Sequence, residues 1–297
     1  MIRYLPCAGL VAATTAFGAV ASVAAQSAFT IRGLAAQGLE HGIAYDIADD
    51  GRIAGEMFDG AGLRHPVVWS AAAANGQELA TSATEGIARA LGPNGEILGW
   101  TERGQGSTRA SIWAPLSPST WALTELETGV TNLPFSGLRG LASDGVAVGF
   151  VDDGIFTRPA AWRDVLGAPV RQLLPMPAFA VGGEATATVV GKAFGYVADF
   201  SESYPVCWLF TGGVPQLSVL PTLSGTGEVQ AVRSNGDAYG SARANDGRVH
   251  LVRWVGAALT DLGTLPQSDC FVGGVNDTGD LVGWARGGGP VPFRAIY

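Results

Sequence analysis

A pair of glycines, spaced as Gly-x-x-x-Gly, recurs six times along this chain of 297 residues and constrains its fold more than any other feature. The first glycines of the pairs are Gly51, Gly95, Gly145, Gly191, Gly236 and Gly279, and the second glycines are Gly55, Gly99, Gly149, Gly195, Gly240 and Gly283. Successive pairs lie 44, 50, 46, 45 and 43 residues apart, and an aromatic residue follows each second glycine by 13 or 14 residues. Those aromatic residues are Trp69, Trp113, Trp162, Trp208, Trp254 and Tyr297. A fixed period of this length is typical of a repeat architecture.

Each repeat has the pattern of four short strands. Apolar residues alternate before the first glycine, as in Val229 to Val232, and a turn such as Ser234-Asn235-Gly236 follows, with the residues that tight hairpins favour. A second strand comes next, a third strand ends at the aromatic residue, and a fourth resembles Leu259 to Leu262. Four strands of period two in about 45 residues are typical of a propeller blade.

We therefore predict an all-β fold, a six-bladed β-propeller that occupies residues 26–297 as one domain. Its repeats start near residues 44, 87, 138, 185, 229 and 272. The sixth repeat ends at Tyr297 before any fourth strand, whereas Phe29 to Leu34 resembles the fourth strand of the other repeats. We expect this N-terminal strand to complete the last blade and close the ring, which leaves no open sheet edge there. An open β-solenoid is the alternative.

The first 25 residues have the pattern of a secretory signal peptide. Arg3 gives a short positive segment, Leu10 to Ala21 an apolar stretch, and Val23-Ala24-Ala25 a small-residue cleavage site. An uncleaved anchor helix is the alternative, which the Ala- and Thr-rich composition disfavours. No later window holds 18 apolar residues. We thus expect a secreted protein, extracellular or periplasmic, with no membrane span after cleavage.

The cysteines and the net charge further limit the class of protein that this chain can be. Loss of Cys7 with the leader leaves Cys207 and Cys270, which are separated by one whole repeat, so two buried thiols are favoured over a disulfide. The formal net charge is -8, and Lys192 is the only lysine, which argues against a nucleic-acid binder. We expect a monomer.

The fifth and sixth repeats resemble a known family. Asp261-Leu262-Gly263-Thr264-Leu265, followed by Val275-Asn276 and Gly279-Asp280-Leu281-Val282-Gly283, is similar to the extracellular HAF repeats of bacterial proteins. No repeat here contains His-Ala-Phe; the nearest segments start at His65 and His250. The resemblance implies an exported repeat protein, and it supplies no catalytic residues.

The loops between the second and third strands carry the candidate ligand-binding residues. Acidic residues lie near the start of these loops in the first four repeats and arginines in the last two, with one exception in the second repeat. The candidates are Asp59, Glu102, Arg103, Asp152, Asp153, Asp199, Arg243 and Arg286. A mixed-charge mouth of the central channel would suit a polar or zwitterionic ligand. Solvated charges at loop tips are the alternative.

Nothing in the sequence points to a metal, a cofactor or a catalytic residue. His65 and His250 occupy equivalent positions four residues before a tryptophan, where other repeats have Arg, Tyr or Phe. The Asx-Gly turns supply too few oxygens for calcium. We expect a non-enzymatic propeller that binds a protein, a glycan or a small ligand through the loop face at the central channel. A secreted hydrolase or lyase that uses the loop acids, and a purely structural envelope component, are the alternatives.

Overall fold

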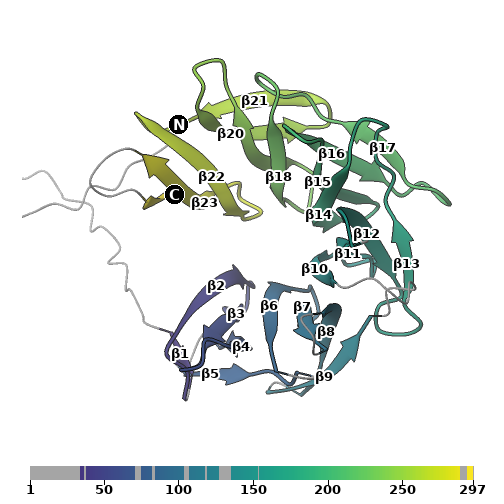
Figure 1. Ribbon diagram of the computed structural model, residues 1–297, viewed down its shortest axis with the longest axis vertical. Coiled ribbons are helices and arrows are strands. Elements are labelled where there is room, and N and C mark those ends of the chain that lie inside the picture. The colour runs from purple at the N-terminus through teal and green to yellow at the C-terminus, as the bar shows by residue number, and fades with distance from the viewer. Residues whose placement is uncertain are drawn as a thin grey trace, which may run out of the picture.

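The computed structural model describes residues 34–36, 38–70, 75–81, 84–103, 107–117, 119–126, 135–152, 154–287 and 293–296. These residues form strands joined by turns, which confirms the all-β prediction. They make six sheets that follow one another around a central space (Figure 1). In the described part of the chain, no helix is long and apolar enough to cross a membrane.

The strands of each sheet follow the repeat. The first sheet contains β1 (Ala35–Ala36), β2 (His41–Ile47), β3 (Ile53–Phe58), β4 (Arg64–Trp69) and β5 (Asn75–Glu78). The second contains β6 (Gly86–Leu91), β7 (Ile97–Glu102), β8 (Thr108–Ser117) and β9 (Thr120–Glu125), and the third β10 (Phe135–Leu141), β11 (Ala147–Asp152), β12 (Thr157–Arg163) and β13 (Val170–Leu173). The fourth contains β14 (Gly182–Val189), β15 (Lys192–Ala198), β16 (Ser203–Leu209) and β17 (Gln216–Val219). The fifth contains β18 (Gly227–Val232), β19 (Ala238–Arg243), β20 (Val249–Val255) and β21 (Ala258–Gly263), and the sixth β22 (Ser268–Val275), β23 (Leu281–Gly287) and β24 (Phe293–Ile296).

Consecutive strands within each sheet pair antiparallel, and the sheets stand radially. The strands β6, β10, β14 and β18 lie toward the centre, whereas β9, β13 and β17 lie outside (Figure 1). Hairpin turns between the first two strands therefore gather at one end of the central channel. The loops between the second and third strands gather at the other end. We call these the turn end and the loop end.

The first glycine of the repeat closes the hairpin turn. Gly145 has a φ of 81° and donates its N–H to the carbonyl oxygen of Ala142 at 3.0 Å. A residue with a β-carbon is strained at such a φ, so glycine is favoured here.

The second glycine of the repeat lies where the first two strands of each sheet approach each other closely. A β-carbon at this position would lie between 1.8 and 2.2 Å from a backbone carbonyl oxygen of the first strand, so a larger residue would force the backbone to move. This holds in all six sheets, at Gly55, Gly99, Gly149, Gly195, Gly240 and Gly283. The predicted structural role of the second glycine is therefore a close approach between paired strands.

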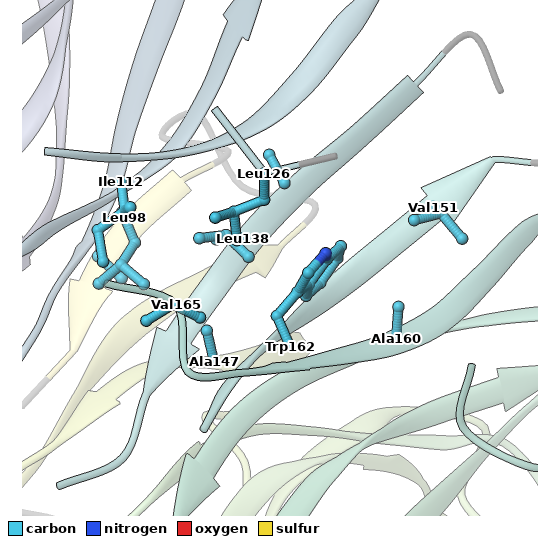
Figure 2. Packing of buried hydrophobic residues seen from close by; sticks show 11 residues of the cluster. Leu98, Ile112, Leu126, Leu138, Ala147, Val151, Ala160, Trp162 and Val165 are labelled. Atoms are coloured by element: carbon cyan, nitrogen blue, oxygen red, sulfur yellow. The ribbon is translucent and has the colours of Figure 1, made fainter. Parts of the chain in front are cut away.

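The core lies between neighbouring sheets. Figure 2 shows the interface of the second and third sheets, where Leu98 and Ile112 pack in one cluster with Leu138 and Trp162. Five tryptophans of the repeat are at most 1% exposed: Trp69, Trp113, Trp162, Trp208 and Trp254. Because the second to fifth sheets have a neighbouring sheet on both faces, their short strands can be largely apolar, which is consistent with the low charge of the chain.

The first and sixth sheets come from the two ends of the described chain, and their ribbons are separated by an open space in the ring (Figure 1). The predicted closing strand lies outside the described residues over Phe29 to Gly33, as does Tyr297, and Leu34 is not in a strand. The strand that follows, β1, pairs in parallel with β5 of the first sheet. On the sixth sheet, Val282 is 51% exposed, whereas Val148 at the equivalent position is fully buried.

Candidate functional site

At the loop end, the predicted aspartates bind to their own loops. Asp199 Oδ1 accepts hydrogen bonds from the backbone N–H groups of Ser201 and Glu202 at 2.7 and 2.8 Å. These bonds, led by that from Ser201, lower the pKa of Asp199 to about 2. Asp59 Oδ1 accepts from the N–H of Leu63 at 2.9 Å, which contributes most to the lowering of its pKa. Both carboxylates stabilise loop conformation as Asx turns do.

The predicted residues of the second and third sheets also find partners nearby. Thr84 Oγ1 donates to Glu102, and the Arg103 guanidinium pairs with Glu125. Asp152 Oδ1 accepts from the N–H of Gly154 at 2.7 Å. The predicted Asp153 lies outside the described residues.

The two predicted arginines belong to the fifth and sixth sheets. Arg243 Nη1 donates to the carbonyl oxygen of Gly247 at 2.9 Å. Arg286 Nη2 lies 3.2 Å from Asp269 Oδ2, and both side chains, with Arg248, line a hollow of about 340 Å³. All these contacts stay within one sheet, so they do not join the predicted acids and arginines into one mixed-charge cluster.

A histidine between two carboxylates occurs twice at the loop end. His65 Nδ1 lies 2.6 Å from Glu78 Oε1 and its Nε2 lies 3.3 Å from Asp59 Oδ2. His250 is held in the same way by Asp261 at 3.0 Å and Asp246 at 3.3 Å. Since both ring nitrogens face carboxylates, neither imidazole offers a free lone pair to a substrate, and this geometry gives no support to the hydrolase or lyase alternative. In the described residues, no group of three or more His, Cys, Asp or Glu side chains is placed to hold a metal ion.

The turn end of the channel is hollowed by a cavity of about 610 Å³. All six sheets contribute to its wall, which includes Asp46, Asp49, Asp50, Arg52, Leu91, Leu141, Ser143, Thr188, Val189, Val232, Ser234 and Asp277. The wall therefore mixes apolar residues from the ends of the first strands with polar residues from the hairpin turns. Polar residues, four of them aspartates, outnumber the apolar ones among these residues.

In each of the six sheets a β-bulge interrupts the strand that precedes the hairpin turn. The pairing register skips one residue in each: Tyr45, Arg89, Arg139, Thr186, Gln230 and Gly273. Bulges re-aim side chains, and five of these six residues are polar. The bulges thus form a polar layer around the channel.

The sign of the charged side chains at this level of the channel differs between sheets. Arg89 lies over the ring of Tyr45 at 4.2 Å, and Arg139 Nε donates to Glu184 Oε2 at 3.2 Å. Burial, and then the charge of Arg139, lower the pKa of Arg89. On the fifth sheet, burial raises the pKa of Glu228, opposed by a hydrogen bond with Ser203 and assisted by the smaller effect of the charge of Glu184. The second and third sheets are therefore cationic here, and the fourth and fifth are acidic.

Sequence reasoning placed the site at the loop end and missed this layer. A signal was available, because Tyr45, Arg89, Arg139 and Gln230 each stand six residues before the first glycine of their repeat, inside an otherwise apolar strand. Polar side chains at one position of a buried strand indicate a place where the strands face a channel.

Two solved structures support the fold class. A prolyl endopeptidase structure superposes with a TM-score of 0.55 at 11% identity, over 84% of this chain and 40% of that chain. TolB from Acinetobacter baumannii superposes with a TM-score of 0.51 at 13% identity, over 76% of this chain and 55% of that one. This chain thus spans about half the length of these proteins or less. Its fold is similar to that of β-propeller proteins.

Sequence comparison adds no family to this result. No family model matches the chain, and no curated protein does. The resemblance to HAF repeats therefore stays an expectation from the residues of the fifth and sixth repeats.

Proposed function

We propose that this chain is a non-enzymatic β-propeller that binds a small polar ligand in its central channel, entered from the turn end. The observation that carries the proposal is the cavity of about 610 Å³ whose wall is built by residues of all six sheets. Such a cavity is large enough for a small molecule. Its lining residues Leu91, Leu141 and Thr188 each stand two residues beyond a bulge residue. The loop-end acids are paired within their own sheets, and His65 and His250 each lie between two carboxylates. Both arrangements favour binding over catalysis.

A binding screen on the chain from Gln26 onward tests this proposal. The screen uses small sugars, amino acids and organic acids, with detection by thermal shift and calorimetry. Thr188→Trp fills the cavity wall, and Arg243→Ala and Asp152→Ala change the loop end. We expect ligands whose binding is lost in Thr188→Trp and kept in the other two variants. A ligand that responds only to the loop-end variants would overturn the turn-end site, and a screen without any hit would overturn the channel as a small-molecule site.

We infer that the ring has six blades and is closed by the residues before Leu34. The support is an equivalence of hydrogen bonds: Trp69 Nε1 donates to the carbonyl oxygen of Ala35 at 2.8 Å, as Trp113 Nε1 donates to that of Ala80 at 2.7 Å. Ala80 follows the fourth strand of the preceding sheet, so Ala35 occupies the place that follows a fourth strand of the sixth. Leu34 and Ala36 also pack in the cluster of Trp69.

The exposed Val282 provides the test of closure. In a closed ring Val282 faces the first blade, so Val282→Asp is expected to destabilise the fold by several kcal/mol, as an unpaired buried charge does. Val148→Asp, at the equivalent position between the third and fourth sheets, is the matched reference. An unchanged midpoint of unfolding for Val282→Asp would show an open ring.

Residues 1–25 support the further proposal that the protein is exported. The chain recovered from the periplasm or the medium is expected to begin at Gln26, and its intact mass tests this. Recovery of the full-length chain from membranes would favour the uncleaved anchor.

A further inference from the structure

We propose that the channel recognises an oxyanion of its ligand, a carboxylate or a phosphate, through the guanidinium groups of Arg89 and Arg139. This inference rests on the proposed function, because it names the chemical class of the ligand for the same channel. Five observations on the polar layer carry it.

The first observation is that Arg89 has no acceptor. Its side chain is half-buried and lies over the ring of Tyr45, and in the described part of the chain its guanidinium makes no hydrogen bond and no ion pair. A guanidinium carries five N–H donors and stays charged at any physiological pH. Partial burial of such a charged group is unfavourable, and a bound oxyanion would supply acceptors for its N–H groups.

The second observation is that the nearby carboxylates are already engaged. Asp46 accepts from the backbone N–H groups of Ile47 and Leu91, each at 2.8 Å. Glu184 pairs with Arg139 at 3.2 Å. Their negative charges act on Arg89 from a distance, but neither carboxylate accepts one of its N–H groups.

The third observation concerns Arg139. Its Nε faces Glu184, and its Nη groups have no hydrogen-bond partner among the described residues. Arg89 and Arg139 occupy the same bulge position on the inner strands β6 and β10 of neighbouring sheets, and the charge of Arg139, after the larger effect of burial, lowers the pKa of Arg89. An oxyanion between them would replace repulsion by two charge-assisted contacts.

The fourth observation is that the guanidinium carbons of both arginines lie over aromatic rings. Arg89 lies 4.2 Å from the centre of the Tyr45 ring, and Arg139 lies 5.0 Å from that of Phe150. The Tyr45 hydroxyl in turn donates to Glu56, which is 2% exposed. Stacking limits the orientation of a guanidinium, so less conformational entropy is lost when it binds an anion.

The fifth observation is access. Leu91 and Leu141 line the cavity at the turn end and stand two residues beyond Arg89 and Arg139 on β6 and β10. The two arginines do not line the cavity themselves, so a ligand body in the cavity would have to extend its anionic group past Leu91 and Leu141 to reach them. Glu184 and Glu228 on the fourth and fifth sheets would disfavour a second negative charge on that side.

Titration with inorganic phosphate and with acetate tests the inference. The chain from Gln26 onward is titrated with sodium phosphate, sodium acetate or sodium chloride at equal ionic strength, and its unfolding midpoint and affinity are measured. We expect phosphate or acetate to raise the midpoint beyond the chloride effect, and the stronger of the two identifies the preferred oxyanion. Arg89→Gln is expected to weaken that binding at least tenfold. Arg89→Lys is expected to weaken it less, because lysine keeps the positive charge but lacks the planar set of N–H donors of a guanidinium.

Arg243→Gln is the matched control. The Arg243 guanidinium lies at the loop end, does not line the turn-end cavity, and already donates to the carbonyl oxygen of Gly247 at 2.9 Å. We expect the anion affinity of this variant to equal that of the natural chain. Without anion, Arg89→Gln is expected to unfold no earlier than the natural chain, because it removes an unpaired charge.

The outcomes separate this inference from the proposed function. If neither anion acts beyond chloride, or if Arg89→Gln binds as the natural chain does, the oxyanion site is overturned. A neutral ligand that is lost only in Thr188→Trp would then still support binding in the channel. If no screened ligand depends on Thr188, the proposed function fails as well.

Discussion

The carbonyl oxygen of Ile87 lies only 1.8 Å from the position that a β-carbon on Gly99 would occupy. Gly99 stands opposite Ala88, directly beside the bulge at Arg89, where β6 approaches β7. Gly195 and Gly240 stand beside the bulges of β14 and β18 in the same way, opposite Ala185 and Val229. The second glycine of the repeat is thus required by the bulge that also builds the polar layer.

Gly99→Ala is expected to destabilise the fold by about 3 kcal/mol or more, because backbone atoms must move to admit the methyl group. Chemical denaturation measures this loss. Gly140→Ala is the control, since its β-carbon would meet Thr188 Cγ2 at an ordinary 3.5 Å and its φ is not positive. We expect that variant to change stability by less than about 1 kcal/mol. Equal effects of the two substitutions would contradict this account.

The repeat, the strand order and the all-β class could be predicted because they depend on periodic local patterns. The Gly-x-x-x-Gly spacing marks a turn and a close backbone approach, and the aromatic residue marks a buried face. The charged channel could not be predicted in the same way. Arg89 and Arg139 are 50 residues apart, and their equivalent positions facing the channel depend on the bulges and on the radial arrangement of the sheets.

The loop-end prediction rested on the correct observation that charges gather after the second strand. What the sequence does not contain is the local partner of each charge. Asp199 binds N–H groups two and three residues further on, and Arg103 meets Glu125 on a different strand of its sheet. Such pairing depends on loop conformation, which no periodicity encodes.

Trp208→Phe is expected to cost about 2 kcal/mol. Trp208 is fully buried, and its Nε1 donates to the carbonyl oxygen of Pro175 at 2.8 Å. The substitution leaves this acceptor without its donor and opens a small cavity. Unfolding in urea measures the change. Trp121→Phe, whose longer bond of 3.4 Å to Gly95 is made by a half-buried ring, should cost less than about 1 kcal/mol. A larger loss at Trp121 than at Trp208 would refute the assignment.

His65 is expected to make stability depend on pH. Burial lowers its pKa, but the hydrogen bonds and charges of Glu78 and Asp59 together outweigh burial and raise it above 6.5. A group whose pKa is raised by folding stabilises the fold fully below the unfolded value, and this stabilisation is lost as the pH rises through the folded value. His65→Gln should therefore lose up to about 1 kcal/mol below about pH 6 and little above about pH 8.

The free energy of unfolding of both proteins, measured from about pH 5 to about pH 9, checks this. His41→Gln is the control, because the His41 ring stacks on Phe58 at 4.8 Å and contacts no carboxylate among the described residues. A constant difference between natural chain and His65→Gln over this range would show that the carboxylates do not hold His65 protonated.

Cys207 and Cys270 are expected to resist thiol reagents until the protein unfolds. Both thiols are free and buried, in the fourth and sixth sheets, and burial raises the pKa of Cys207 to about 11. At about pH 8 only about one Cys207 in a thousand would then be the reactive thiolate. Ellman's reagent without reductant should thus report no thiol in the native chain from Gln26 onward and two in denaturant. Cys207→Ser should report one. Absence of thiols in denaturant would reveal a disulfide, and rapid native labelling would show that the sheets do not enclose these residues.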